Sequence, residues 1–87
     1  MNVEQAIRER LDVLHPEFLE LSDESVLHAG HAGAQGGGGH YRVHIVSAQF
    51  SGQSSVARHR MVYAALGPLM HREIHALALQ AKAPGEQ

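Results

Sequence analysis

Three histidines flank a run of glycines in the stretch LHAGHAGAQGGGGHY, which covers residues 27–41. Glycine loses more conformational freedom on folding than any other residue, so the four glycines at 36–39 predict a flexible loop. Imidazole is also the commonest metal ligand among protein side chains. His28 and His31 are therefore candidate metal ligands, although a loop histidine with no function would look the same in sequence.

The remaining side chains argue against catalysis by this chain. It has no cysteine, which excludes a catalytic thiol and any thiolate metal site built by this chain alone. Asp23 and Glu24 are adjacent, so in a strand they point to opposite faces and cannot form an acid–base pair. No serine lies in a nucleophile elbow, and Gly36–Gly39 lacks the Lys-Ser/Thr of a phosphate loop. We expect a protein that is not an enzyme.

Length and charge set further limits. The 87 residues are enough for a single domain, 1–87, and no more. Seven Lys and Arg against nine Asp and Glu make a poor electrostatic case for nucleic acid. The N-terminus carries acidic residues and lacks the apolar stretch of a signal peptide, and no apolar run reaches membrane-spanning length. We therefore expect a cytoplasmic protein with no membrane contact.

Hydrophobic periodicity predicts an α+β (α/β) fold with the order αββα(α)β. The first helix follows a capping box at Asn2–Gln5 and ends at His15-Pro16. A second helix begins after an N-cap at Ser54 and breaks at Gly67-Pro68, where the proline opens a short extra turn. Alternating patterns predict strands at about 18–25, 40–48 and 74–83, and the tail 84–87 is expected to fray.

The order of these elements predicts where the ends of the strands meet. A helical crossover makes the second and third strands parallel, whereas the hairpin loop 28–39 makes the first and second antiparallel. His75, at the start of the third strand, is therefore expected beside that loop. We expect His75 to share a face with Leu77 and Leu79, opposite Ile74. Its place among the first residues of the strand, near an edge, favours exposure of at least one ring nitrogen, and a half-buried core histidine is the alternative. With His28 and His31 it would supply the three ligands that a zinc site needs at minimum.

Five short motifs resemble, in order and spacing over nearly the whole chain, those of the BolA family. They are Asp23-Glu24-Ser25, His40-Tyr41-Arg42-Val43, Val46-Ser47 with Phe50-Ser51-Gly52, Arg58-His59-Arg60, and Ile74-His75-Ala76-Leu77-Ala78-Leu79. The resemblance implies a class II KH-like fold with a three-stranded mixed sheet and helices on one face. The order of elements expected from periodicity agrees with that fold.

The resemblance also implies a partner, a monothiol glutaredoxin, with a two-iron two-sulfur cluster bridged between the two proteins. Glutaredoxin and glutathione would supply thiolates, and this chain would supply imidazole. The ligand histidine of the family matches His75, and its loop ligand matches His28, with His31 as a competing neighbour. No cluster is then expected in the isolated chain, which would be a monomer or weak homodimer. The run Gly36–Gly39 departs from the shorter, Ser/Glu-containing loop of many relatives.

A second function follows from the same resemblance, because the family has also been described as transcriptional regulators linked to stress response and cell morphology. Arg58, His59 and Arg60 are the candidate residues for contacts with a partner's acidic groups or with DNA phosphates. A solvated helix face is the alternative for these residues. The KH module clamps nucleic acid with a GXXG loop between two helices, whereas Gly30-His31-Ala32-Gly33 lies in the hairpin loop.

Overall fold

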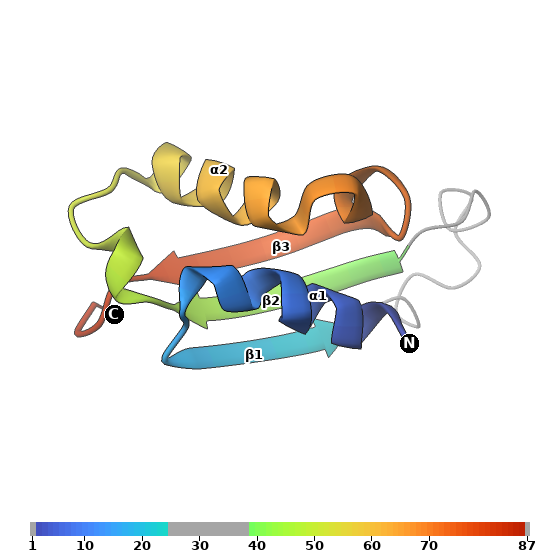
Figure 1. The fold of residues 1–87 in the computed structure, drawn as a ribbon, viewed down its shortest axis with the longest axis horizontal. Helices are drawn as coiled ribbons and strands as arrows, with labels where there is room; N and C mark the ends of the chain where they lie inside the picture. The colour runs from blue at the N-terminus through green and yellow to red at the C-terminus, as the bar shows by residue number, and fades with distance from the viewer. Residues whose placement is uncertain (1, 25–38, 87) are drawn as a thin grey trace.

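The computed structural model describes residues 2–24 and 39–86 of the chain (Figure 1). Within them lie two α-helices, three strands and three short 3₁₀ turns. In chain order these are α1 (Val3–Leu11), η1 (Asp12–Leu14), β1 (Phe18–Asp23), β2 (Gly39–Val46), η4 (Ala48–Phe50), α2 (Ser55–Leu66), η5 (Gly67–His71) and β3 (Ile74–Lys82). The predicted loop lies outside the described residues, except that Gly39 belongs to β2.

The sheet has the predicted topology. Its strand order is β1-β2-β3, with β1 antiparallel to β2 and β2 parallel to β3. Asp23 at the end of β1 pairs with Tyr41, and Gly39 at the start of β2 pairs with Ile74 at the start of β3. We call this end of the sheet, formed by residues 23–24, 39–40 and 73–75, the rim. It is the right-hand end in Figure 1.

Both helices begin at the predicted caps. The Asn2 side chain accepts a hydrogen bond from the Gln5 amide at 2.8 Å, and the Ser54 hydroxyl accepts one from the Ala57 amide at 3.1 Å. Each bond satisfies a backbone donor that the first helical turn would leave unpaired. At the end of α2, Gly67 has φ 58°, a conformation that glycine adopts at no steric cost, and η5 follows it.

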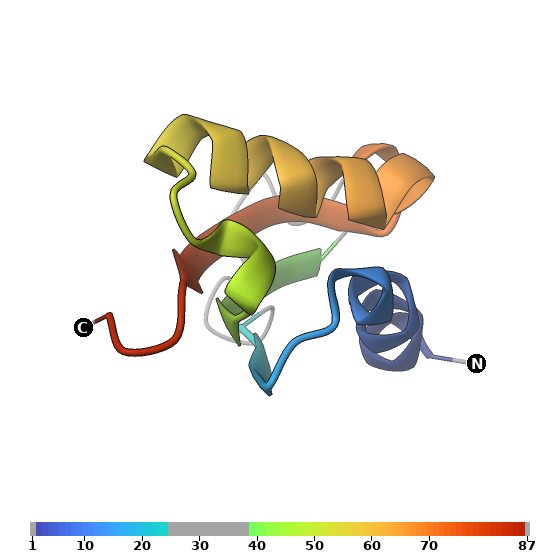
Figure 2. The same cartoon turned by 60° about the vertical axis from the view of Figure 1, so that its left-hand side comes forward.

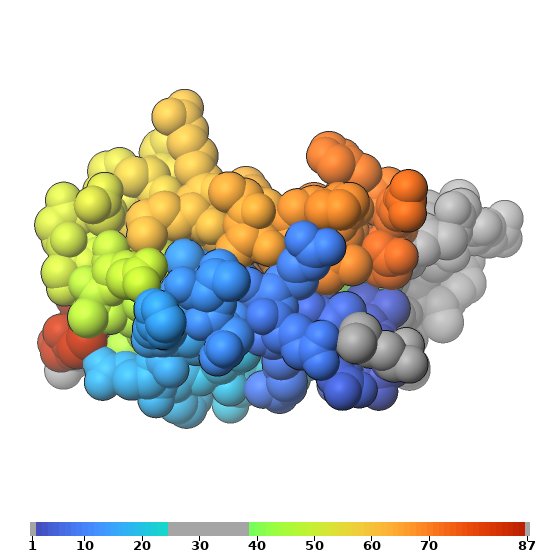
Figure 3. All heavy atoms as spheres, in the orientation of Figure 1, coloured from blue at the N-terminus to red at the C-terminus, as the bar shows by residue number. Residues whose placement is uncertain are grey.

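The two helices cover one face of the sheet, as expected (Figures 1 and 2). In the space-filling view the side chains of α1 and α2 meet over that face (Figure 3). Beneath them lies a continuous core of fully buried side chains, among them Ile7, Leu11, Val43, Ile45, Phe50, Val62 and Leu66. Each such side chain contributes about 1.5–3 kcal/mol by leaving water. Within the described residues, no helix is long and apolar enough to cross a membrane.

An ion pair ties the C-terminal residues to α2. Arg58 Nη2 donates to Glu86 Oε2 at 2.8 Å, and Arg58 Nη1 donates to Glu86 Oε1 and to the Ala81 carbonyl. Glu86 Oε1 also accepts from the Ala83 amide at 3.1 Å. We expected residues 84–87 to fray, but residues 84–86 form a turn held by this pair, which no local pattern in the sequence reveals.

Replacing Glu86 should destabilise the protein in a pH-dependent way. The hydrogen bond from Arg58 lowers the pKa of Glu86 from 4.5 to about 2. A lowered pKa stabilises the folded state above pH 4.5, and that stabilisation is lost as the pH falls from 4.5 through about 2. Glu86→Gln should therefore lower the urea midpoint at neutral pH, and its difference from wild type should shrink across this interval.

Glu17→Gln is the matched control, because it makes the same charge change at an exposed residue in the loop before β1. It should leave the urea midpoint nearly unchanged. Equal urea midpoints for wild type and Glu86→Gln at neutral pH would contradict the assignment of a stabilising role to the Arg58–Glu86 pair.

Candidate functional site

His75 is exposed at the rim, as its place at the start of the strand predicted, but the faces predicted for Ile74 and His75 are wrong. Ile74 was expected on the outer face, but it is 2% exposed and belongs to the core. The cause is an irregularity in the pairing of β2 with β3. Gly39 pairs with Ile74 and the next residue, His40, pairs with Ala76, so His75 is one extra residue in β3. Such a bulge reverses the alternation of faces, which places His75 in solvent rather than in the core.

The imidazole of His40 lies beside that of His75. Their ring centroids are 5.3 Å apart, and the ring planes are tilted by 52°. Backbone hydrogen bonds on both sides of β2 hold this corner. The Gly39 amide donates to the Glu73 carbonyl, and the Glu24 amide donates to the His40 carbonyl, each at 2.7 Å. The rim therefore presents two neighbouring imidazoles on a hydrogen-bonded backbone.

Two charged groups near His40, Arg42 and Glu24, are paired with each other. Arg42 Nε donates to Glu24 Oε2 at 2.9 Å, and this hydrogen bond raises the pKa of Arg42. Burial, followed by the charges of Asp23 and Glu4, raises the pKa of Tyr41. The raised pKa keeps the Tyr41 hydroxyl protonated at neutral pH. The hydrogen bond from Arg42 separately holds the Glu24 carboxylate toward Arg42.

The described part of the rim is a two-imidazole site. No group of three or more His, Cys, Asp or Glu that could hold a metal ion occurs within residues 2–24 and 39–86. Glu73 Oε2, two residues before His75, is buried and has no hydrogen-bond partner among the described residues. His28 and His31 lie outside the described residues, so the predicted three-histidine zinc site and the predicted loop ligand both stay predictions.

The structure separates Arg58, His59 and Arg60 from the histidines at the rim. Arg58 bonds to the Ala81 carbonyl, six residues along β3 from His75, which is about 20 Å of strand. Its side chain is only 12% exposed, because it binds Glu86 and the Gln53 carbonyl. His59 packs edge-on against Tyr63, whereas Arg60 is exposed. Of the two arginines, Arg58 has a structural role, which the motif alone did not indicate.

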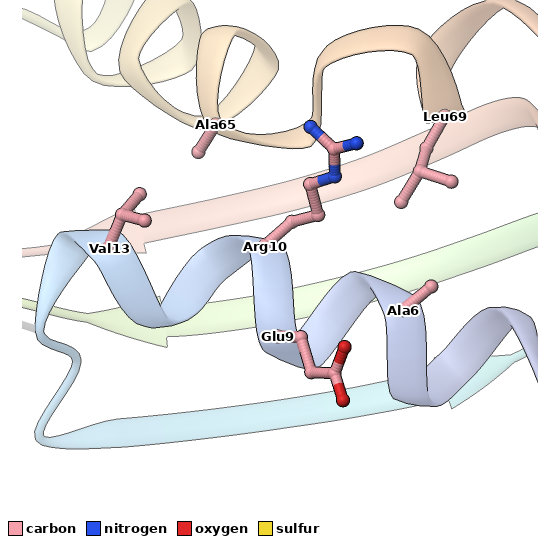
Figure 4. Close-up of a pocket in the computed structure, with 6 residues that line it drawn as sticks. All are labelled: Ala6, Glu9, Arg10, Val13, Ala65 and Leu69. Carbon is pink, nitrogen blue, oxygen red and sulfur yellow. The ribbon is translucent and has the colours of Figure 1, made fainter. Parts of the chain in front are cut away.

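A separate hollow of about 430 Å³ lies between α1 and α2. Figure 4 shows Arg10 extending from α1 across it, and the guanidinium lies beside Gly67. The other lining residues are Ala6, Glu9, Val13, Ala65 and Leu69. This hollow has no histidine, so the rim remains the candidate metal-ligating site.

These features define a class of protein: a small α+β domain with a mixed three-stranded sheet, two helices on one face, and histidines where the parallel strands begin. The family model for BolA-like proteins matches residues 11–86. The chain belongs to the BolA family, as the sequence motifs predicted.

Individual relatives agree with this assignment. BolA-like protein 1 of Bos taurus is 47% identical over 97% of this chain, and the chain spans 61% of that protein's length. The DNA-binding transcriptional regulator BolA of Escherichia coli is 39% identical over 91% of this chain and 73% of its own length. Among solved structures, the BolA domain of SufE1 from Arabidopsis thaliana is 38% identical, with a TM-score of 0.82 over 100% of this chain and 99% of that one. The sequence matches thus show the BolA family, and the structural match shows the fold of a BolA domain.

The start of β2 leaves no room for a side chain at Gly39. A Cβ built there would lie 2.5 Å from Cε2 of Tyr41, which is buried. Gly39→Ala should therefore force the Tyr41 ring to move and destabilise the fold by about 1–3 kcal/mol, which urea unfolding would measure. The double variant Gly39→Ala/Tyr41→Leu removes the clashing ring and should lose less than the two single losses added together. Strict additivity would show that the Tyr41 contact is not the reason for glycine at this position.

Proposed function

We propose that this chain is an adaptor without enzymatic activity that binds a monothiol glutaredoxin and ligates one edge of a two-iron two-sulfur cluster shared with it. The function would belong to iron–sulfur and iron homeostasis. The observation that carries the proposal is the exposed imidazole of His75 at the rim, on a strand start whose backbone is fixed by pairing with β2.

The donor chemistry of the chain fits a shared cluster. Iron–sulfur clusters are held mainly by thiolates, and this chain has none, so glutaredoxin and glutathione have to supply them. Two imidazoles replace two thiolates on one iron in Rieske centres, so histidine ligation of such a cluster is established chemistry. His75 would be one of the imidazoles. His28, with His31 as its competitor, is the proposed second ligand.

Exposure of His75 also suits a partner that approaches the end of the sheet. A ligand shared between two proteins must reach beyond the surface of its own domain, and a half-buried core histidine would not. Because the chain spans about three-fifths of the length of the mammalian relatives it matches, the partner and cluster are proposed for this segment alone. The cytoplasmic location predicted from the N-terminus stays a prediction.

Co-purification with a monothiol glutaredoxin and glutathione tests the proposal. The wild-type pair, reconstituted with iron and sulfide under reducing conditions, should show visible absorption that differs from the spectrum of glutaredoxin alone. His75→Ala should remove most of that difference, since it removes the exposed imidazole ligand. His28→Ala and His31→Ala identify the loop ligand, because only the residue that ligates should change the spectrum.

His44→Ala is the control, because His44 lies on the same outer face of the sheet, contacts Phe18, and is part of β2 away from the rim. It should leave the spectrum unchanged. A wild-type spectrum from the His75→Ala pair would rule out His75 as a ligand, and failure of the wild-type chain to alter the glutaredoxin spectrum at all would refute the shared cluster.

DNA binding as a transcriptional regulator is the second candidate, favoured by the similarity to the DNA-binding transcriptional regulator BolA of Escherichia coli. Arg58 is paired with Glu86, and Arg42 on β2 is paired with Glu24. Arg60 is exposed, so it is the arginine of the Arg58-His59-Arg60 motif that would contact phosphate. Binding through phosphates weakens steeply with salt. If DNA is the partner, Arg60→Ala should reduce the slope of log affinity against log salt by about one. An unchanged slope would remove Arg60 from the DNA contact.

A further inference from the structure

We propose that the free edge of β3 binds an extended peptide segment of a partner protein, one that carries aromatic side chains at alternate positions. Such a segment would add a fourth strand to the sheet. In the described sheet, β3 has a neighbouring strand, β2, on one side only (Figure 1). The proposal depends on neither glutaredoxin nor an iron–sulfur cluster, so it goes beyond the proposed function.

The hydrogen bonds of β3 show which of its backbone groups face the free edge. In a parallel pair, alternate residues of a strand direct both their N–H and their C=O groups toward the neighbouring strand. The Lys82 carbonyl accepts from the amide that follows β2, whereas the Ala81 carbonyl accepts from Arg58 of α2. Two and four residues before Ala81, Leu79 and Leu77 therefore direct their amides and carbonyls away from β2. These four groups can bind an added strand.

Two side chains already occupy the edge at the C-terminal end of β3. Arg58 Nη1 donates to the Ala81 carbonyl at 3.2 Å, and Glu86 Oε1 accepts from the Ala83 amide at 3.1 Å. Among the described residues, no side chain makes such a bond to the backbone at residues 77–79. The open part of the edge therefore lies at the middle of β3.

The charges on the two outer strands also favour β3 as the strand that accepts a partner. Charged side chains are a common protection of sheet edges against pairing with another chain. β1, at the other edge of the sheet, carries Glu20 and Asp23. Residues 74–81 of β3 contain no Asp, Glu, Lys or Arg. An added strand would therefore meet no charged side chain along the open part of β3.

Two hollows lie beside this edge, on the outer face of the sheet, which the helices leave uncovered. Each has a volume of about 320 Å³, and both are lined by Arg42 and Ala78. They form where the short side chains of Ala76 and Ala78 pair with the long ones of His40 and Arg42. One hollow is displaced from the other by two residues along β3, which is about 7 Å. Side chains at alternate positions of an added strand have the same spacing and would fill one hollow each.

Arg42 indicates which side chains fit the hollows. Its Nε donates to Glu24 Oε2 at 2.9 Å, and its side chain is still 62% exposed. A planar guanidinium held by a carboxylate presents its face to solvent, and aromatic rings stack on such a face. An aromatic ring also has the bulk to cover the alanines of β3. The segment that fits therefore has aromatic residues two positions apart.

A capped peptide of seven residues, threonine throughout except for phenylalanine at its third and fifth positions, is the probe. In an extended chain both phenylalanines point to one face. Adding the probe to the 87-residue chain should slow hydrogen exchange of the Leu77 and Leu79 amides, which NMR measures residue by residue. The Ala78 and Gln80 amides face β2 and should exchange slowly with or without the probe.

A peptide and two variants provide the controls. The control peptide has the same composition with phenylalanine at its third and fourth positions, so its rings point to opposite faces and it should bind more weakly. Ala78→Leu fills both hollows at an exposed position and should weaken binding of the probe about two- to tenfold, the effect of losing an aromatic contact. Ala64→Leu makes the same change at an exposed position of α2 and should bind as wild type does.

Three results would overturn the proposal. The first is fast exchange of the Leu77 and Leu79 amides at millimolar probe, and the second is equal binding of the two peptides. The third is slow exchange of these amides without any peptide, increasing with the concentration of the chain, which would assign the edge to a second copy. None of these measurements contains glutaredoxin or iron, so the shared cluster is tested independently.

Discussion

Parallel pairing of β2 with β3 is the constraint on which the site depends. A parallel pair begins at one end of the sheet, so residues separated by more than thirty positions in sequence start side by side. The pairing of Gly39 with Ile74, followed by that of His40 with Ala76, leaves His75 as the extra residue. The same irregularity buries Ile74 in the core and turns the His75 imidazole to solvent. The bulge therefore determines both the burial of Ile74 and the exposure of the proposed ligand His75.

The two ends of the domain have different roles. At the rim, imidazoles face outward on a backbone held by hydrogen bonds. At the opposite end, Arg58 joins the start of α2 to the end of β3 and to Glu86. Arg58, which the sequence motif assigned to contacts with a partner, therefore has a structural role. A side chain that contacts a partner molecule has to be exposed, and both His75 and Arg60 are exposed.

Much of this fold follows from the sequence, for reasons that are local. Asn2 and Ser54 cap their helices because their side chains reach amides three residues ahead. Strand alternation places Tyr41, Val43 and Ile45 in the core, and the helical crossover requires parallel strands. These steps were enough to bring His75 to the predicted end of the sheet.

What the sequence did not predict depends on contacts between distant residues. A bulge is set by the pairing of two strands, so strict alternation assigned His75 to the face of Leu77 and Leu79 and did not reveal its contact with His40. The sequence does not indicate that Arg58 is paired, because its partner Glu86 is 28 residues away in the chain. The loop that carries His28 and His31 lies outside the described residues, and its part in the site rests on the family resemblance.

The contact between the first residues of β2 and β3 is the central claim, and a nuclear Overhauser spectrum of the isolated chain tests it most directly. The account predicts cross-peaks between the ring protons of His40 and His75, whose centroids lie 5.3 Å apart, and between backbone protons of Gly39 and Ile74. Cross-peaks from His75 to residues near Val46 would mean that the strands run in opposite directions. That result would contradict both the rim and every function proposed for it.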